Sequence, residues 1–407
     1  MAISGDKALG LYLSVPFCRS KCTYCNFASG VFPASDHDRY VARLVEQLKD
    51  ARRWAGGMSA VLPERVDTIY FGGGTPVLLS VDHLRTIFAA IRDGFDVDAD
   101  AEITMEAAPG QISDAVLEAM ASVGVNRVSL GVQSFVDREA QLSGRLHSRE
   151  IVLEDLKRLR AAGIANLNVD LLAGLAEQTR DSWRESVAVL LASGVPHASV
   201  YMLEIDEESR LGRELIGGGA RYGAGLVPND DAIAAMYEEA VAELDAAGLR
   251  QYEISNFGVE GRASKHNLRY WQRRPYLGVG LDASSMLRDA DGMVLRTTTT
   301  SDLAEYMNED CVPMETAWLG PVQQLEEAWF LGLRRNDGVA VAELCAEFGD
   351  EAVAPALVVA ERLAADGLLA VEDGRVRLTS RGRLISNDVF AEFLGLAPVR
   401  ELSNSNR

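Results

Sequence analysis

The sequence predicts an α/β fold: a partial barrel of six βα units followed by a small, winged-helix-like α+β domain. From residue 9 to about 205, short runs rich in Val, Ile, Leu and Tyr alternate with longer amphipathic stretches, the pattern of a parallel sheet. A chain of 407 residues is longer than one ordinary hydrophobic core can accommodate. The pattern of apolar and polar residues also changes near residue 322. We expect a barrel core at 1–235, a barrel extension and connecting region at 236–320, and a C-terminal domain at 321–407.

Each unit of the predicted barrel pairs a strand with a helix, and several helices open with Ser or Asp as a cap. Six repeats of this alternation indicate a barrel or a doubly wound sheet. We expect strands at 9–14, 66–71, 101–105, 127–131, 165–171 and 198–203, and helices at 38–54, 81–91, 113–122, 149–161 and 180–192.

The rest of the chain is less regular. One helix is expected at 230–247, followed by a passage rich in Gly, Asn and Tyr and by a threonine run at 297–300. Helical patterns then cover 322–333, 339–348 and 351–366. Two short strands joined by Asp373 and Gly374 follow, and this dipeptide is a strong hairpin signal. Three helices and a hairpin resemble a winged helix, a likeness of fold that says little about function.

The net charge restricts the classes of binding partner, and the cysteine pattern indicates the cellular compartment. A formal net charge of −20 argues against binding along nucleic-acid phosphates or an anionic membrane surface. Three of the five cysteines lie within eight residues, while Cys311 and Cys345 are isolated, which is not the pattern of a disulfide framework. No segment reaches the length of a transmembrane span. We therefore expect a cytoplasmic protein with no nucleic-acid partner and no transmembrane segment.

The segment PFCRSKCTYCNF places Cys18, Cys22 and Cys25 at CxxxCxxC spacing, directly after the first predicted strand. Three thiolates can hold three irons of a [4Fe-4S] cluster, leaving the fourth iron for the amino and carboxylate groups of S-adenosylmethionine (SAM). A zinc site is the alternative, but it needs four ligands, and His37 is the only nearby candidate for the fourth. The spacing favours the cluster.

Polar residues or glycines recur at the carboxyl ends of the predicted strands, where ligands bind in parallel α/β folds. The run FGGGTP could be only a tight turn, and any single Glu or Gln could be a cap. Their shared position at one rim favours a common ligand. The set consists of Cys18, Gly73, Gly74, Thr75, Glu106, Gln133 and Asp170.

The chain contains nine short motifs that, in the order in which they occur, resemble those of radical SAM proteins related to oxygen-independent coproporphyrinogen III oxidase. Within that group it is most similar to the HemW-like heme chaperones. The resemblance extends from residue 9 to about 395 and implies a radical SAM barrel. The motifs are LYLSVPFCRSKCTYCNF, FGGGTP, MEAAPG, GVNRVSLGVQSF, GRLHS, NVDLLAGL, QYEISNF, HNLRYW and LTSRGRLISNDVF.

The resemblance implies a role for each matching residue. Cys18, Cys22 and Cys25 would ligate the cluster. In chemical terms a Glu106 carboxylate suits an ammonium, Arg145 a carboxylate, and Asp170 a pair of ribose hydroxyls. The implied SAM residues are Tyr12, Tyr24, Gly73, Gly74, Thr75, Glu106, Gln133, Arg145 and Asp170.

The motif HNLRYW is associated with heme in the chaperone-like members. The resemblance thus implies that His266 is an axial ligand to heme iron and that Tyr270 and Trp271 flank the macrocycle. Taken alone, a single His is more often a hydrogen-bonded structural residue, and Tyr and Trp usually belong to a core.

Two functions follow from the resemblance. In one, the protein carries heme and hands it to an acceptor protein. In the other, it is an oxidase that decarboxylates coproporphyrinogen III through a radical made from SAM. The cysteine motif of the oxidases has the pattern CxxxCxxCxC, whereas Phe27 stands at the position of the last cysteine in this chain. The oxidases also carry a longer segment before the cluster loop than this chain does. The motif HNLRYW is intact in this chain. All three features favour the carrier.

A third class, nucleic-acid modification, predicts a basic domain beside the barrel, and no segment of the sequence is that basic. The chain also departs from the family pattern. Ser14 and Ser284 stand where similar proteins carry His, so the roles of those histidines do not transfer. The heme acceptor is not identified by the sequence. Transient contact of this protein with a membrane protein is compatible with the sequence.

Overall fold

The computed structural model describes residues 8–307 and 314–396, so Cys311 lies outside the described residues. Six parallel strands lie side by side in chain order at the centre of one mixed sheet. All six predicted strands are confirmed. Their bounds are β1 Ala8–Val15, β3 Arg65–Gly73, β4 Asp96–Ala107, β5 Arg127–Gln133, β6 Asn166–Ala173 and β7 His197–Met202.

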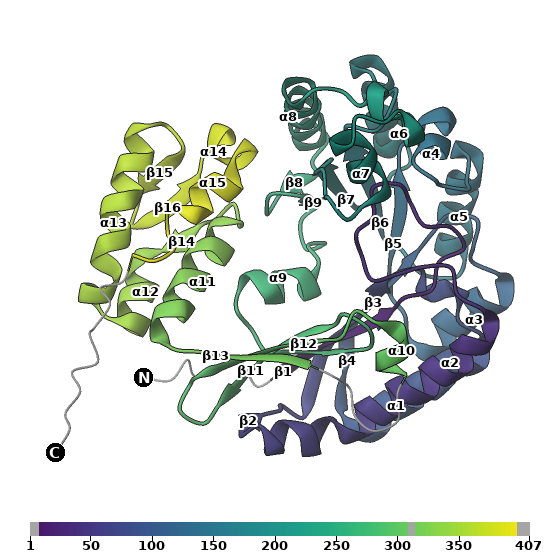
Figure 1. Cartoon of the computed structure of the whole chain (residues 1–407), viewed down its shortest axis with the longest axis horizontal. Helices are drawn as coiled ribbons and strands as arrows, with labels where there is room; N and C mark the ends of the chain where they lie inside the picture. The colour runs from purple at the N-terminus through teal and green to yellow at the C-terminus, as the bar shows by residue number, and fades with distance from the viewer. Residues whose placement is uncertain (1–7, 308–313, 397–407) are drawn as a thin grey trace.

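Helices cover one face of this sheet (Figure 1). Four helices are capped by a side chain that accepts a hydrogen bond from a backbone N–H in the first turn; the caps are Ser80, Ser113, Ser148 and Thr179. These helices therefore begin within one residue of the predicted positions. The first helix is longer than predicted because it begins directly after Pro33. The helices are α1 Ala34–Gly57, α2 Val81–Gly94, α3 Asp114–Val123, α4 Asp137–Leu142, α5 Arg149–Ala161, α6 Arg180–Ala192 and α8 Asp230–Ala246.

The region between 204 and 320 extends both edges of the sheet with short strands that the sequence did not reveal. β10 (Tyr276–Val279) pairs parallel with β1, and β11 (Ser284–Asp289), β12 (Val294–Thr299) and β13 (Met314–Leu319) continue it antiparallel. On the other side β9 (Asn256–Gly258) pairs antiparallel with β7, and β8 (Arg250–Gln251) follows. Since the strand order ends at β13 and β8, the sheet is open and the barrel incomplete. The remaining short elements are β2 Ala60–Val61, α7 Arg210–Ile216, α9 Lys265–Trp271 and α10 Leu303–Tyr306.

The C-terminal domain has its own apolar core, in which Trp329 stacks on Phe393 with ring centroids 4.9 Å apart. The three predicted helices and the hairpin are present, with Asp373 and Gly374 both at positive φ in the turn. The elements are α11 Pro321–Leu333, β14 Val339–Ala340, α12 Val341–Phe348, α13 Asp350–Ala365, β15 Leu369–Glu372, β16 Arg375–Leu378, α14 Ser380–Leu384 and α15 Ser386–Ala391.

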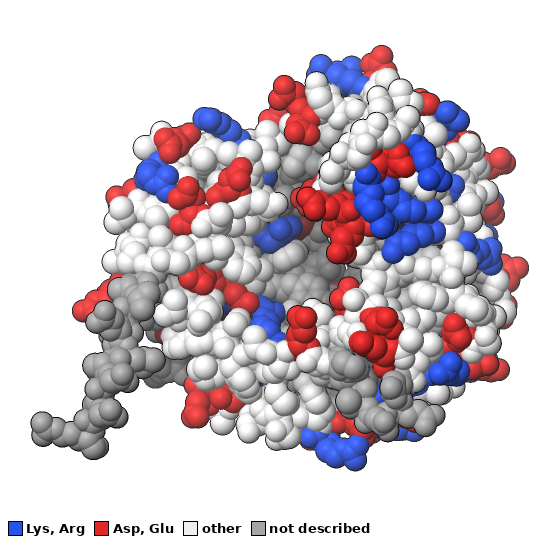
Figure 2. All heavy atoms as spheres, viewed as in Figure 1, with Lys and Arg blue, Asp and Glu red and all other residues white. Residues whose placement is uncertain are grey.

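Alternation along the parallel strands gives the sheet two different faces. Apolar side chains such as Leu11 and Leu13 pack into the core. Thr68, Tyr70 and Glu102 point to the opposite face, where Thr68 and Tyr70 hydrogen-bond to other side chains and Glu102 accepts from a backbone N–H of α9. Helix α9 lies on this polar face, between the barrel and the C-terminal domain (Figure 1), and Figure 2 shows the molecule hollowed there. Within the described ranges, none of the helices is both long and apolar enough to cross a membrane.

Candidate cofactor site

The three clustered cysteines lie on the loop between β1 and α1, and backbone hydrogen bonds close this loop on itself. Cys18 N–H donates to Gly30 O over 2.8 Å, and Gly30 N–H donates to Pro16 O over 2.9 Å. The Lys21 ammonium donates to the carbonyls of Phe27 and Ser29, each at 2.9 Å. These bonds hold a short polar loop in one conformation without a long apolar segment to anchor it.

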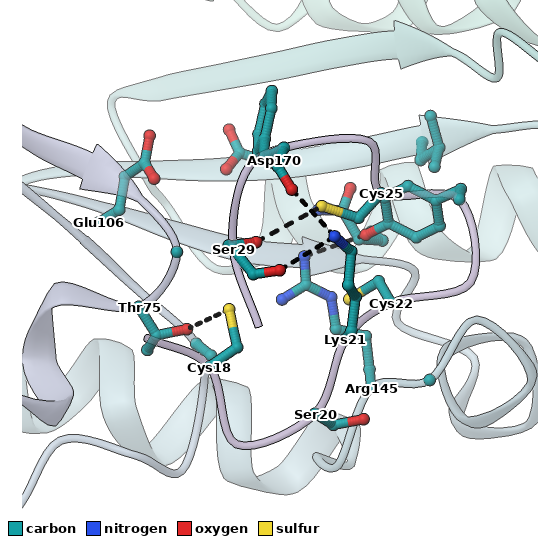
Figure 3. Close-up of a pocket in the computed structure, with 18 of the residues that line it drawn as sticks. Cys18, Ser20, Lys21, Cys22, Cys25, Ser29, Thr75, Glu106, Arg145 and Asp170 are labelled. Carbon is teal, nitrogen blue, oxygen red and sulfur yellow. Dashed lines mark hydrogen bonds between the residues drawn. The ribbon is translucent and has the colours of Figure 1, made fainter. Parts of the chain in front are cut away.

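All three thiols line one pocket (Figure 3). The Thr75 hydroxyl lies 3.9 Å from Cys18 Sγ, and Ser29 Oγ lies 4.0 Å from Cys25 Sγ. Burial raises the pKa of the Cys18 thiol, and the neighbouring Ser29 and Thr75 hydroxyls partly offset this because they stabilise a thiolate.

The arrangement of the thiols bears on the zinc alternative. Across residues 8–307 and 314–396, no three His, Cys, Asp or Glu side chains are grouped closely enough to hold one metal ion. His37, the suggested fourth ligand, stacks on Phe17 with ring centroids 3.8 Å apart and does not line the pocket. A structural zinc site needs four ligands around one ion. A cluster places each thiolate on a different iron, so the donor set fits a cluster and not a zinc ion.

The glycine segment at the end of β3 packs directly against the cysteine loop. Gly74 N–H donates to Val15 O over 2.8 Å, and Thr75 N–H donates to Phe17 O over 2.7 Å. A Cβ atom on Gly74 would lie only 2.7 Å from Val15 O, so this approach requires glycine. The two segments predicted to bind cofactor are thus joined through their backbones.

Glu106 lies at the end of β4 with its carboxylate facing the same pocket (Figure 3). Its Oε1 accepts a hydrogen bond from the Tyr70 hydroxyl over 2.9 Å. Burial raises the pKa of Glu106 to about 7, with the Tyr70 and Gly73 hydrogen bonds opposing the shift and Asp170 adding to it. Near neutral pH this carboxyl therefore changes charge readily when a ligand approaches it.

Arg145 also lines the pocket, and it is the only cationic side chain among the residues predicted to bind SAM. Arg145 Nη2 donates to the Tyr24 hydroxyl over 3.0 Å, and its guanidinium lies over β5 because position 131 is glycine. A Cβ atom on Gly131 would lie 2.9 Å from Arg145 Nη2. Asp170 on β6 accepts from Asn168 over 2.7 Å, and burial raises its pKa. The predicted residues thus give the pocket the Arg145 guanidinium and the carboxyl groups of Glu106 and Asp170.

The pocket has a volume of about 370 Å³ and collects nearly all the residues predicted to bind the cluster and SAM. Tyr12 is the exception: it lies outside the pocket lining and stacks on Tyr70 with centroids 6.1 Å apart. Of the two departures from the family pattern, Ser14 is buried beside Gly73, and Ser284 is exposed on β11. The predicted residues in the lining are Cys18, Cys22, Tyr24, Cys25, Gly73, Gly74, Thr75, Glu106, Gln133, Arg145 and Asp170.

Sequence reasoning missed several residues of the lining, among them Lys21, Ser129, Tyr201 and Glu204. Ser129 precedes Gly131 by two positions on β5, so a period of two counted back from the strand end would have identified it. Tyr201 lies on the same side of its strand as Ser199 and faces the pocket near Asp170.

His266, Tyr270 and Trp271 lie on α9, away from this pocket. His266 is 1% exposed; its Nδ1 lies 2.9 Å from Thr68 Oγ1, and its Nε2 lies 2.8 Å from the Tyr270 hydroxyl. Burial, together with Arg269 and Arg127, lowers its pKa to about 3, so the imidazole is neutral. Arg334 of the C-terminal domain lies 4.4 Å from the Trp271 ring centroid.

The hydrogen bonds of His266 bear on its predicted role as an iron ligand. Both ring nitrogens are occupied, so in this conformation His266 is not open to iron. Ligation through Nε2 requires the Tyr270 hydroxyl to move away, whereas ligation through Nδ1 would break a contact with the sheet itself.

Comparison with known proteins agrees with this arrangement. The radical SAM superfamily matches residues 12–190, which include the cysteine loop and strands β3 to β6 of the pocket, and the HemN C-terminal domain matches 319–385. The Heme chaperone HemW of Lactococcus lactis is 32% identical over 393 residues, covering 96% of this chain and 98% of that protein.

The chain therefore belongs to the HemW family. The Heme chaperone HemW of Escherichia coli is 34% identical over 300 residues, covering 74% of this chain and 75% of that protein. Coproporphyrinogen III oxidase (HemN) of Escherichia coli, a radical SAM enzyme of known structure, superposes with a TM-score of 0.79 at 22% identity, covering 95% of this chain and 90% of that one. It shows that the two proteins share the radical SAM fold.

The raised pKa of Glu106 predicts a change in pH dependence when its charge is removed. Because folding favours the protonated form, ionisation of Glu106 costs stability progressively as the pH rises from its ordinary pKa of 4.5 to about 7. Glu106→Gln lacks this cost, so urea unfolding should show its stability relative to wild type increasing between pH 5 and pH 8. A difference between the two proteins that does not change with pH would contradict the raised pKa.

Proposed function

We propose that this protein is a heme chaperone that holds a [4Fe-4S] cluster on Cys18, Cys22 and Cys25, binds SAM beside it, binds heme, and transfers the heme to an acceptor protein. The observation that supports this most is the convergence of three thiols, a glycine segment and Glu106 on one pocket in a chain of the HemW family. The acceptor is a protein of unidentified type. Thiols held free for metal binding fit the reducing cytoplasm.

The pocket residues fit both cofactors chemically. Three thiolates hold three irons, and the cluster supplies an open iron and a one-electron donor when bound. Glu106 accepts hydrogen bonds from the amino group of SAM, Arg145 pairs with its carboxylate, and Asp170 accepts from the ribose hydroxyls. The Lys21 ammonium, which touches no carboxylate within the described residues, offsets the negative charge of the thiolates.

Phe27 distinguishes this site from the oxidase alternative. Its side chain is 60% exposed and lines the pocket mouth, at the position where the oxidase motif has a further cysteine. The pocket therefore lacks that thiol. The structural match to HemN at 22% identity concerns the fold and gives no support to an oxidase activity.

Helix α9 is the proposed heme site. Its neutral His266 has the protonation state that binds iron, and Tyr270 and Trp271 lie about one turn farther along the same helix. The Tyr270 hydroxyl now occupies Nε2 of His266, so heme binding exchanges that hydrogen bond for an iron ligand. The hollow beside α9 leaves room for a ligand to approach (Figure 2).

Removal of one cluster ligand tests the cofactor assignment. Cys22→Ala should lose most of the iron and sulfide after anaerobic reconstitution, because two thiolates do not hold a four-iron cluster. Cys345→Ala, which removes the thiol of the C-terminal domain, should retain both. Iron and sulfide analysis with electron paramagnetic resonance measures this, and a Cys22→Ala protein with a full cluster would overturn the assignment.

Two substitutions on α9 test the heme assignment from opposite directions. His266→Ala should lower heme retention and leave the iron–sulfur spectrum unchanged. Tyr270→Phe frees Nε2 of one hydrogen bond worth about 1 kcal/mol and should therefore tighten heme binding about fivefold. Heme titrations followed by absorbance measure both. An unchanged heme stoichiometry in His266→Ala would rule out His266 as the ligand.

A further inference from the structure

The two proposed ligand sites are attached to the same two strands. On β3, Thr68 Oγ1 contacts Nδ1 of His266, and on β4, Glu102 Oε1 accepts a hydrogen bond from the His266 backbone N–H over 3.1 Å. Farther along these strands, β3 leads into the glycine segment and β4 ends at Glu106. Helix α9 is therefore fixed to the strands whose carboxyl ends form the cofactor pocket.

Tyr70 on β3 lies between the two sites and contacts both. Its hydroxyl donates to Glu106 Oε1 over 2.9 Å, and its ring lies 5.3 Å from the imidazole of His266, tilted by 30°. The ring also stacks on Tyr12, which restricts its movement on a further side. Burial raises the pKa of Tyr70, so the phenol stays protonated and acts as a donor to the carboxyl group.

We propose that Tyr70 is a positioning residue that couples the cofactor pocket to the His266–Tyr270 pair, so that a ligand bound at Glu106 changes the heme affinity of α9. The inference rests on the proposed function, since it takes the ligand at Glu106 to be the amino group of SAM and the ligand of α9 to be heme.

The coupling follows from competition at one carboxyl group. A hydrogen-bond donor arriving at Glu106 draws charge away from the bond with Tyr70, which weakens that bond or moves the phenol. Because the Tyr70 ring packs against Tyr12 and His266, a shift of the phenol displaces the imidazole. The imidazole is in turn bonded to Thr68 and Tyr270, so its displacement alters the hydrogen bond that heme must replace.

A cofactor-free experiment tests the path itself. Glu106→Gln replaces the carboxyl group that Tyr70 contacts with an amide that does not ionise, and it should shift the ring ¹⁵N resonances of His266 in protein labelled with [¹⁵N]histidine. The same substitution in a Tyr70→Phe background should leave them unshifted, because the link is already broken. Tyr306→Phe is the matched control: it removes a buried tyrosine hydroxyl bonded to Gln47 at 2.8 Å, outside the path, and should preserve the shift.

Heme titrations with and without SAM test the consequence. In wild type and in Tyr306→Phe, SAM should change the heme dissociation constant at least fivefold, and heme should change the SAM dissociation constant by the same factor. In Tyr70→Phe both ratios should fall to about one, while each ligand still binds alone.

The outcomes separate this inference from the proposed function. Ratios that stay at the wild-type value in Tyr70→Phe, or a His266 signal that Glu106→Gln does not move, would overturn the coupling even if heme and SAM both bind. A protein that binds no heme would overturn the proposed function, and the resonance experiment would then decide the coupling alone.

Discussion

The site depends on two backbone hydrogen bonds, from Gly74 N–H to Val15 O and from Thr75 N–H to Phe17 O. They join the end of β3 to the start of the cysteine loop, and they form only because glycine permits the close approach at position 74. The thiols, the Thr75 hydroxyl and the glycine segment consequently face one pocket. Glu106 and Asp170 reach it from later strands, because parallel strands all end at the same edge of the sheet. Arg145 reaches it from the connection between α4 and α5.

The polar face of the sheet links this pocket to α9. In most proteins of this size the interior is apolar, and buried polar groups are tolerated only where they are hydrogen-bonded. Here Thr68, Glu102 and Tyr270 are hydrogen-bonded to His266, and Tyr70 is hydrogen-bonded to Glu106. The ring contact between Tyr70 and His266 connects these two hydrogen-bonded groups. A network of this kind holds α9 firmly and also gives a change at one end a route to the other.

The parallel strands and their helices could be predicted from the sequence because each is a continuous buried run or a capped amphipathic segment. The short strands β8 to β13 could not, since they contain only two to six residues, and the sheet edges that they extend, β1 and β7, lie at other places in the chain. The same distinction applies to the site. Glu106 and Asp170 were found because they lie near the carboxyl ends of strands, whereas Tyr70 was not found. The contact of His266 with Thr68 joins residues 198 positions apart.

We propose that three thiolates hold a four-iron cluster whose fourth iron faces SAM. A Mössbauer spectrum of protein reconstituted with ⁵⁷Fe, recorded before and after SAM is added, measures this most directly. We expect four irons per chain, of which one changes its isomer shift when SAM binds. A spectrum that SAM leaves unchanged, or one iron per chain in a mononuclear site, would contradict it.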